Sequence, residues 1–377
     1  MRLGNLILPG DRLEAGVPDM PVSGIFYDSR GDLRGGAFFA LPGARTDGDL
    51  HAAEALRKGA AAVVSRSGAP AGLPPGAAWV RAADITATFS HAAAEFHGRP
   101  SESLKVVGVT GTNGKTTITY MLESVFARLG MKPGVIGTVN YRIGGEVVSS
   151  APNTTPMAPD LHGLLARMVS TGSRAAVMEV SSHSLALGRA DSVKFDCAVF
   201  TNLQSDHLDF HKDRENYLRA KLKLFTLTAA SGKEDRAAVV NADEDAAGEV
   251  ARAAAGAKVL AYALDKPADI TAVDAVYGPG GISFTLRTPA GEAPVKLRLF
   301  GRHNLYNALA AAGAAHALGV PPADIAAGLE ALEKVPGRLE PVRAGQDFAI
   351  FVDYAHTADA LESVLKSLRG GHGRRLL

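Results

Sequence analysis

The sequence has 377 residues but only one cysteine, Cys197. One cysteine cannot form a disulfide within the chain, and this composition is typical of a reducing compartment, so we expect a cytoplasmic location. The sequence also lacks an excess of one charge: 40 Lys and Arg residues stand against 39 Asp and Glu residues, a formal net charge of +1. A general nucleic-acid-binding protein would show a clear basic excess, so we expect no binding to nucleic acid.

Long apolar runs are missing as well. No segment approaches the roughly 18 consecutive apolar residues that span a bilayer, so membrane insertion is not expected. Residues 1–16 hold a short apolar patch, but acidic residues and a proline follow too soon for a secretory signal. The hydrophobic content of 46% and charged content of 21% are ordinary for a globular protein, and the length indicates two or three domains.

The predicted elements divide the chain into three parts and favour an α/β fold. Residues 1–99 mix short strands with helical runs, which indicates a small α/β domain. Residues 100–335 open with a polar, proline-containing break and continue as short apolar runs between helices. These runs predict a central domain with a mostly parallel sheet, and they are Leu104–Val109, Ala175–Val180, Ala198–Thr201 and Ala237–Val240. Residues 336–377 start another strand, Phe348–Val352, but are too few for a complete domain.

The Ala-rich and Gly-rich stretches of the central part are predicted to form helices and strands. The Ala-rich stretches Ala251–Ala255 and Ala308–Ala315 keep a helical spacing of apolar and polar positions around them, so they are predicted as helices rather than linkers. The Gly-rich stretch Asp269–Phe300 alternates like antiparallel strands.

The most specific motif lies between a predicted strand and a predicted helix and reads V-V-G-V-T-G-T-N-G-K-T-T. Gly111 and Gly114 allow the backbone to curl so that its N–H groups point at phosphate oxygens. Lys115 offers a cation to the β- and γ-phosphates, and the Thr116 hydroxyl can bind Mg²⁺. The common pattern G-x-x-x-x-G-K-[ST] fails only at its first position, Val109. An incidental turn is the alternative, but the context favours a nucleotide site formed by Gly111, Thr112, Asn113, Gly114, Lys115, Thr116 and Thr117.

Three polar strings follow this loop along the chain. Glu179 ends a buried strand, where a carboxylate can hold Mg²⁺ beside a phosphate loop, although capping of the next helix is an alternative. The string F-T-N-L-Q-S-D-H-L-D-F-H at residues 200–211 contains histidines such as His207 that can bind a metal, or it is simply a solvated loop. In the following helix, spacing alone gives no reason to prefer Lys221 to Lys223 as a functional residue.

A second block, at residues 27–48, forms a strand, a tight glycine turn, another strand and a polar loop. Backbone amides there, with Ser29 and Arg45, can meet a diphosphate, but from the residues alone a structural turn is the better interpretation. The string Asn153–Thr155 could contact a substrate, but a turn with hydroxyl groups explains it equally well.

Taken in order, these strings resemble the tripeptide-forming members of the Mur ligase family. They are D-S-R…G-x-x-F-x-A-x-x-G…D-G, T-G-T-N-G-K-T-T, E-V-S-S-H, D-H-L-D-F-H, Y-x-x-A-K, G-x-x-N-x-x-N and D-Y-A-H-T. The resemblance covers essentially the whole chain, and folylpolyglutamate synthases lack the first block. Two positions depart from the family pattern: Ala358 replaces a proline, and Leu187 stands where some members have a glutamine, which puts that substrate contact in doubt.

The resemblance implies an ATP-dependent amide ligase of peptidoglycan synthesis that works through an acyl phosphate. The substrates would be UDP-N-acetylmuramoyl-L-alanyl-D-glutamate and a diamino acid, with meso-diaminopimelate expected and L-lysine second. Two Mg²⁺ ions would be held by Thr116, Glu179, His207 and Lys221, of which Lys221 would be carbamylated by CO₂. Lys115, Lys221 and His207 would be catalytic, in a protein expected to be a monomer.

The resemblance also assigns binding residues outside the phosphate loop. Asn304, Arg338 and Asp353 would contact the nucleotide, although helix capping by Asn304 and Asp353 and an exposed role for Arg338 stay open. The UDP-sugar and its peptide would be bound by Tyr27, Ser29, Ala44, Arg45, Thr46, Asn153, Thr154, Thr155, Ser181 and Arg189. The three domains would be a UDP-sugar-binding domain (1–99), an ATP-binding domain (100–335) and the beginning of a Rossmann-like C-terminal ligase domain (336–377).

Two rival functions are considered from the sequence. The Mur ligase that forms the tetra- or pentapeptide shares the three-domain plan but not the E-V-S-S-H and D-H-L-D-F-H strings. A non-catalytic phosphate-loop module would not need the N-terminal block or Lys221. Since the family places amino-acid selection in a region beyond Leu377, these 377 residues alone are expected to bind substrates without forming the tripeptide.

Overall fold

The computed structural model describes residues 1–43, 46–204, 206–278, 280–342, 344–346, 348–356 and 358–369. Two compact units share the chain. The first contains residues 1–103, 156–167 and 187–193, and the second contains residues 104–155, 168–186 and 194–377. Each unit combines helices with a largely parallel sheet, so the expected α/β class is confirmed.

The first unit is built on five strands in the order β1-β5-β4-β3-β2. Only β1 runs antiparallel to its neighbour. Successive side chains of a strand point to opposite faces, so Phe38 and Phe39 enter two separate cores, one with residues of α1 and the other with residues of α2. The elements are β1 (Arg12–Ala15), β2 (Ile25–Phe26), β3 (Ala37–Phe39), α1 (Ala52–Arg57), β4 (Ala62–Ser65), β5 (Ala78–Arg81) and α2 (Ile85–Phe96).

Two later segments of the chain complete the first unit. Ala158, at the start of α4 (Ala158–Ser170), is fully buried in the same core as Phe89 of α2. In the segment 187–193, the backbone N–H of Ser192 donates to Ser90 Oγ at 3.0 Å. No local pattern in the sequence marks these returns to the first unit.

The second unit contains eight strands in the order β13-β12-β11-β6-β10-β7-β8-β9. The first six are parallel and the hairpin β8–β9 is antiparallel. All four strands predicted for the central domain are confirmed. The strands are β6 (Lys105–Thr110), β7 (Gly134–Ile136), β8 (Asn140–Ile143), β9 (Glu146–Ser150), β10 (Ala175–Glu179), β11 (Cys197–Phe200), β12 (Ala237–Asn241) and β13 (Lys258–Tyr262).

The position of β6 explains where a site can form. Its two neighbours, β10 and β11, both come later in the chain, so the strand order reverses around β6. In open parallel sheets the crevice at such a switch point, beyond the carboxyl ends of the strands, is the usual ligand site. The loop after β6, which leads into α3 (Lys115–Arg128), is the predicted phosphate loop.

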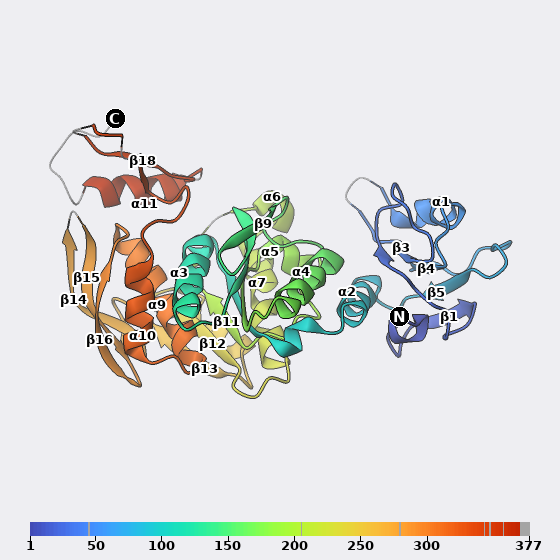
Figure 1. Ribbon diagram of the computed structural model, residues 1–377, viewed down its shortest axis with the longest axis horizontal. Coiled ribbons are helices and arrows are strands. Elements are labelled where there is room, and N and C mark those ends of the chain that lie inside the picture. The colour runs from blue at the N-terminus through green and yellow to red at the C-terminus, as the bar shows by residue number, and fades with distance from the viewer. Residues whose placement is uncertain are drawn as a thin grey trace. The chain divides into compact units, whose positions relative to one another are not determined.

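A second layer packs against α3. Helices α9 (Arg302–Ala317) and α10 (Pro322–Ala331) lie between α3 and an antiparallel sheet of β14 (Thr271–Gly278), β15 (Gly281–Thr288) and β16 (Gly291–Leu297) (Figure 1). This sheet confirms the antiparallel structure predicted for Asp269–Phe300. The remaining helices of the unit are α5 (Ser182–Ala186), α6 (Leu208–His211), α7 (Arg214–Ala229) and α8 (Ala247–Ala253). The last helix includes residues 251–253 of the first Ala-rich stretch and ends before residues 254–255.

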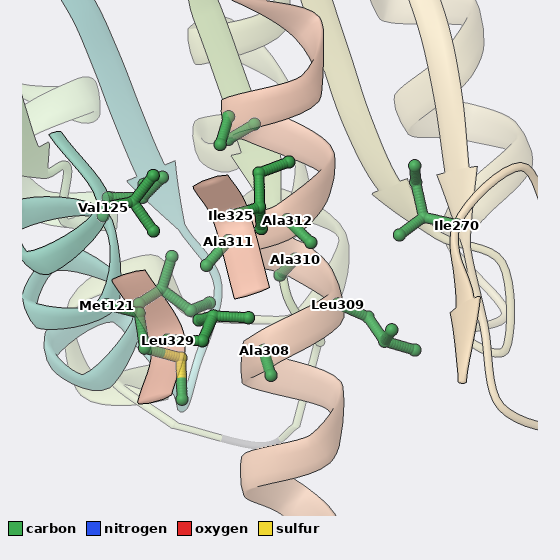
Figure 2. Close-up of a cluster of buried hydrophobic side chains, with 14 of the residues drawn as sticks. Met121, Val125, Ile270, Ala308, Leu309, Ala310, Ala311, Ala312, Ile325 and Leu329 are labelled. Atoms are coloured by element: carbon green, nitrogen blue, oxygen red, sulfur yellow. The ribbon is translucent and has the colours of Figure 1, made fainter. Parts of the chain in front are cut away.

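Small residues allow this layer to pack closely. Met121 and Val125 of α3 lie near Leu329 of α10, and the alanines of α9 fill the space beside them (Figure 2). A Cβ on Gly328 of α10 would lie 2.5 Å from Val125 Cα, so only glycine permits this approach. The alanine-rich composition of the second predicted helix is therefore explained by burial, since Ala308–Ala312 have no exposed surface.

The last described elements are β17 (Glu340–Val342), β18 (Ile350–Val352) and α11 (Ala358–Arg369), with β17 antiparallel to β18. The predicted strand Phe348–Val352 is thus two residues shorter than expected. No helix in the described ranges is both long and apolar enough to cross a membrane.

A buried ion pair beside α3 supports a stability prediction. Arg142 and Glu123 have 7% and 12% of their side chains exposed and lie 2.6 Å apart. Glu123→Ala should lower the free energy of unfolding by about 3 kcal/mol, because it leaves a buried guanidinium without its carboxylate. Urea unfolding measures the change. In the exposed pair Arg219–Glu215, Glu215→Ala should cost at most about 0.5 kcal/mol, and equal losses in the two variants would contradict the role of burial.

Candidate active site

The phosphate loop has the backbone that its glycines were predicted to allow. Gly111 has a φ of 142° and Gly114 a φ of 91°. A Cβ on Gly111 would clash with Thr201 Oγ1, and a Cβ on Gly114 would clash with Asn307 Oδ1. Since α3 begins at Lys115, its unpaired N-terminal N–H groups face the loop, which suits an anion.

Gly114→Ala should therefore weaken nucleotide binding. The substitution strains the backbone by about 1–3 kcal/mol and displaces Asn307, so we expect the Kd for ADP to rise by about tenfold or more. Isothermal titration calorimetry measures the affinity. The control is Gly130→Ala, which also has a positive φ, of 66°, but has no atom within 4 Å of the added Cβ. An unchanged Kd for Gly114→Ala would show that the loop tolerates a side chain there.

Lys115 curls back over the loop. Its Nζ donates to the carbonyl oxygens of Gly111 at 2.8 Å and Thr112 at 2.7 Å. Burial lowers the pKa of Lys115, while the negative charge of Glu179 opposes the shift and the positive charge of Arg338 adds to it. The ammonium therefore lies among the residues that the sequence analysis had assigned to metal and nucleotide.

Glu179 stands at the end of β10, beside the strand that leads into the loop, where it pairs with Val109 of β6. Its side chain is 1% exposed. Oε1 accepts from the Thr138 backbone N–H at 2.8 Å and Oε2 from the Thr138 hydroxyl at 3.0 Å. Because these bonds engage Thr138, the carboxylate does not cap α5, and within the described ranges it has no ion-pair partner within 4 Å.

Predicted substrate residues gather around this strand end. Thr154 Oγ1 lies 3.1 Å from Thr138 Oγ1, and Thr155 Oγ1 donates to the Glu179 carbonyl at 2.8 Å. The backbone N–H of Ser181 in turn donates to Thr155 Oγ1 at 3.2 Å. The neighbouring Asn153 accepts the Tyr141 hydroxyl through its carbonyl oxygen at 2.5 Å.

A polar cavity of about 410 Å³ opens beside the loop and is lined by Asn113, Gly114, Thr117, Asn304, Arg338 and Asp353, among other residues. Arg338 Nη2 donates to Thr116 Oγ1 at 3.1 Å, although the two residues are 222 positions apart. Asn304 lies inside α9, whose N-cap is Gly301, and its amide donates to the Phe300 carbonyl at 2.7 Å, so it does not cap the helix.

Helix capping was also left open for Asp353. Its carboxylate accepts the N–H groups of Leu339 at 2.7 Å and Ala355 at 2.8 Å, which fixes the chain at the cavity rim rather than the start of α11. The predicted nucleotide residues of the loop, α9 and the C-terminal segment thus meet around one space within the second unit.

The two lysines that spacing could not separate differ in burial. Lys221 is 1% exposed, whereas Lys223 is only partly buried. Lys221 Nζ lies 4.1 Å from the centre of the Tyr217 ring, and no hydrogen bond or ion pair to it is found in the described part of the chain. Burial lowers the pKa of Lys221 well below its usual range, and the charge of Lys115 lowers it further.

His207 has left-handed backbone, with a φ of 53°. Its Nε2 lies 3.4 Å from Asp206 Oδ2, and its ring centre lies 4.8 Å from that of His183. No group of three His, Cys, Asp or Glu side chains in the described ranges is arranged to hold a metal. The predicted ligand set contains only two residues of those types, Glu179 and His207, so it depends on the Thr116 hydroxyl and on Lys221.

The remaining predicted substrate residues belong to the first unit. Tyr27 donates its hydroxyl to Asp160 Oδ2 at 3.2 Å, and burial raises the pKa of Tyr27 to about 12 with help from Asp160. Arg189 lies close enough for its charge to oppose that shift. Ser29 donates to Glu54 at 3.2 Å, and the Thr46 hydroxyl lies 3.0 Å from His51 Nε2. Ala44 and Arg45 lie outside the described residues.

Three residues that the sequence analysis did not assign join the site. Thr138 holds Glu179, Asp206 acts on both Lys115 and Lys221 through its charge, and Tyr217 lies between Lys221 and the phosphate loop. Asp206 and Tyr217 lie within two of the sequence motifs, but the sequence analysis assigned roles only to His207 and Lys221 in those motifs. Thr138 carries no local signal, because its role depends on Glu179, which is 41 positions away.

Comparison with known proteins agrees with this geometry. Residues 109–315 match the Mur ligase middle domain. A UDP-N-acetylmuramoyl-L-alanyl-D-glutamate--2,6-diaminopimelate ligase of Geobacter metallireducens is 44% identical over 371 residues, which are 98% of this chain and 72% of that protein. A solved structure of a ligase with the same name superposes with a TM-score of 0.83 at 29% identity, over 98% of this chain and 74% of that one.

A structure of MurF from Acinetobacter baumannii is also similar, with a TM-score of 0.66 and 25% identity over 92% of this chain and 71% of that one. Since the middle-domain match covers more than half of the sequence and a relative is 44% identical along almost all of it, the chain belongs to the Mur ligase family.

Proposed function

We propose that the protein is an ATP-dependent ligase that joins 2,6-diaminopimelate to UDP-N-acetylmuramoyl-L-alanyl-D-glutamate in peptidoglycan synthesis. The observation that carries the proposal is the 44% identity to a ligase of that name over 98% of the chain. The geometry supports it, because a phosphate loop, a buried carboxylate and a polar cavity meet at the switch point of a parallel sheet. The lower similarity to MurF speaks against the tetra- or pentapeptide-forming rival.

The reaction needs activation because a carboxylate resists attack by an amine. ATP would supply the phosphoryl group that turns the D-glutamate side-chain carboxyl into an acyl phosphate, from which the amine of the incoming amino acid displaces phosphate. The loop N–H groups and the Lys115 ammonium would stabilise the negative charge on the transferring group. Arg338 would bring a second positive charge to the same edge through its bond to Thr116.

The residues present fit Mg²⁺. Glu179 is a buried carboxylate whose described hydrogen-bond donors are both neutral, and a buried anion of this kind is stabilised by a cation. We propose that Glu179, the Thr116 hydroxyl, His207 and Lys221 hold two Mg²⁺ ions, which would neutralise charge on the phosphates.

Lys221 can take part only after chemical change, since an ammonium cannot bind a metal. A buried ammonium without a carboxylate partner is unfavourable, so Lys221 is suited to the neutral amine form. We propose that this amine adds to the carbon of CO₂ and loses one N–H proton, which gives a carbamate with an anionic oxygen. No carboxylate in the described part of the chain forms an ion pair with Lys221, although the charge of Asp206 opposes the lowering of its pKa.

Roles for the parts of the chain follow the same proposal. Residues 1–99 would bind the UDP-sugar through Tyr27, Ser29 and residues 44–46, helped by Arg189 of the same unit. Residues 100–335 would bind ATP and, through Asn153–Thr155 and Ser181, the peptide part. Residues 336–377 would begin the C-terminal ligase domain. We propose a monomer that works in the cytoplasm, where UDP-linked precursors are made.

The direct test incubates the full gene product with ATP, Mg²⁺, UDP-N-acetylmuramoyl-L-alanyl-D-glutamate and either meso-diaminopimelate or L-lysine. Mass spectrometry should detect the UDP-tripeptide with diaminopimelate, and ATP should be consumed only when the UDP-dipeptide is present. ATP consumption that ignores the UDP-dipeptide, with no tripeptide formed, would overturn the proposal. A product with L-lysine alone would correct the amino acid and leave the reaction class standing.

A further inference from the structure

One buried aromatic side chain contacts both the phosphate loop and Lys221, the proposed metal ligand. Tyr217 is 1% exposed and lies on α7, four residues before Lys221, so both side chains project from the same face of the helix. Its hydroxyl lies 3.2 Å from Oγ1 of Thr112 in the phosphate loop. Its ring lies under Lys221, with Nζ 4.1 Å from the ring centre.

The direction of the hydroxyl bond follows from counting donors. Thr112 Oγ1 accepts the Gln204 backbone N–H at 3.0 Å and lies 3.3 Å from the Gln204 carbonyl oxygen, to which it can donate. If Tyr217 donates to Thr112, every one of these groups is paired. In the opposite arrangement the Gln204 carbonyl loses its donor. Tyr217 is therefore the donor, which anchors the ring to the phosphate loop.

The ring is held on other sides as well. The ring centre of His211 lies 5.1 Å away and that of His207 lies 6.4 Å away. His211 is itself fixed, because its Nε2 lies 3.0 Å from Ser182 Oγ. Because its hydroxyl is bonded to Thr112 and its ring contacts Lys221 and His211, Tyr217 has little freedom to move independently of the loop.

We propose that Tyr217 is a positioning residue that fixes the Lys221 amine relative to the phosphate loop. The inference rests on the proposed function and adds a residue to it. A free lysine side chain occupies many rotamers, and ordering it costs up to about 2 kcal/mol. A rigid aromatic ring beneath the amine, tied to Thr112, removes much of that freedom before substrates bind. We expect this fixed position to raise kcat, because a misplacement of about 1 Å can lower the rate about a hundredfold.

Two substitutions test the hydroxyl bond to Thr112 and the aromatic ring separately. Tyr217→Phe keeps the ring and removes the bond to Thr112, so kcat should fall by about tenfold while the KM for ATP changes little. The carbamate signal of Lys221, observed by ¹³C NMR after addition of ¹³C-bicarbonate, should remain. Tyr217→Leu removes the ring as well, so the carbamate signal should weaken severalfold and kcat should fall by about a hundredfold.

The matched control is Tyr120→Phe, which removes a half-buried tyrosine hydroxyl bonded to Arg142 elsewhere in the second unit. It should leave kcat and the carbamate signal at wild-type levels. A double-mutant cycle between Tyr217→Phe and Thr112→Val should show non-additive losses in kcat, because both substitutions remove the same bond.

Different outcomes would contradict the positioning role of Tyr217 and the proposed function. A Tyr217→Phe enzyme with wild-type kcat, or additive losses in the cycle, would overturn the positioning role. If Tyr217→Leu does not fold, Tyr217→Phe and the cycle still decide. A wild-type enzyme that forms no UDP-tripeptide would instead defeat the proposed function, and an unchanged carbamate signal in a folded Tyr217→Leu variant would still count against the inference.

Discussion

Lys115→Ala should lower kcat for ligation by about 10²–10³-fold, with the fold intact. Lys115 is the cation of the phosphate loop, and its Nζ lies over the loop carbonyls, with no ion-pair partner among the residues that the structure describes. A negatively charged phosphoryl group can therefore draw the ammonium away from two neutral acceptors at modest cost. Without it, the protein groups left to stabilise charge on the transferring group are the backbone N–H groups and Arg338, beside the proposed Mg²⁺ ions.

The measurement separates catalysis from folding. Steady-state rates give kcat, circular dichroism and thermal unfolding report the fold, and calorimetry gives the Kd for ADP. The Kd should rise less than kcat falls, because the loop N–H groups remain. Lys258→Ala, which removes an exposed lysine at the start of β13, serves as the control and should match the wild type. Wild-type turnover in Lys115→Ala would remove the phosphate loop from the mechanism.

Lys221→Ala should abolish most activity, again by at least about a hundredfold, because the proposed magnesium site loses its anionic ligand. A short carboxylate such as acetate can occupy the space left by the side chain and offer the missing oxygen. Added acetate or propionate should therefore restore part of the activity in this variant, while leaving the wild type unchanged. The ¹³C carbamate signal should be absent from Lys221→Ala.

Lys223→Ala is the matched control, since it removes the same side chain two residues away on the same helix. Lys223 is only partly buried, so its loss should leave both rate and carbamate signal at wild-type levels. Equal losses in the two variants would show that the helix needs lysine for stability rather than for metal binding. A wild-type enzyme without any carbamate signal, in ¹³C-bicarbonate, would refute the modification itself.

Several site features were accessible from the sequence because they are local. The phosphate loop needs only consecutive residues: two glycines at positive φ, a lysine and hydroxyls between a strand and a helix. The α/β class followed from apolar runs of strand length between helices, since both periodicities are properties of the chain itself. The strand at β10 and its terminal Glu179 were predicted for the same reason.

Other features required the folded chain. Spacing left Lys221 and Lys223 equivalent, and in the sequence only the family motif Y-x-x-A-K distinguished Lys221. The structure adds the physical difference, which is burial of Lys221 against Tyr217. The bond between Arg338 and Thr116 joins residues 222 positions apart, and the returns of residues 156–167 and 187–193 to the first unit have no local pattern. Each depends on how distant segments fill the same space.

The sequence by itself therefore determined the nucleotide loop, the α/β class and, through ordered motifs, membership of the Mur ligase family. Only the tertiary structure decided which lysine is buried, that Glu179 bonds to Thr138 rather than capping α5, and that Tyr217 ties the loop to Lys221. The physical reason is that backbone conformation and periodicity are set by neighbouring residues. Burial, charge and hydrogen-bond partners are set by side chains that folding brings together from far along the chain.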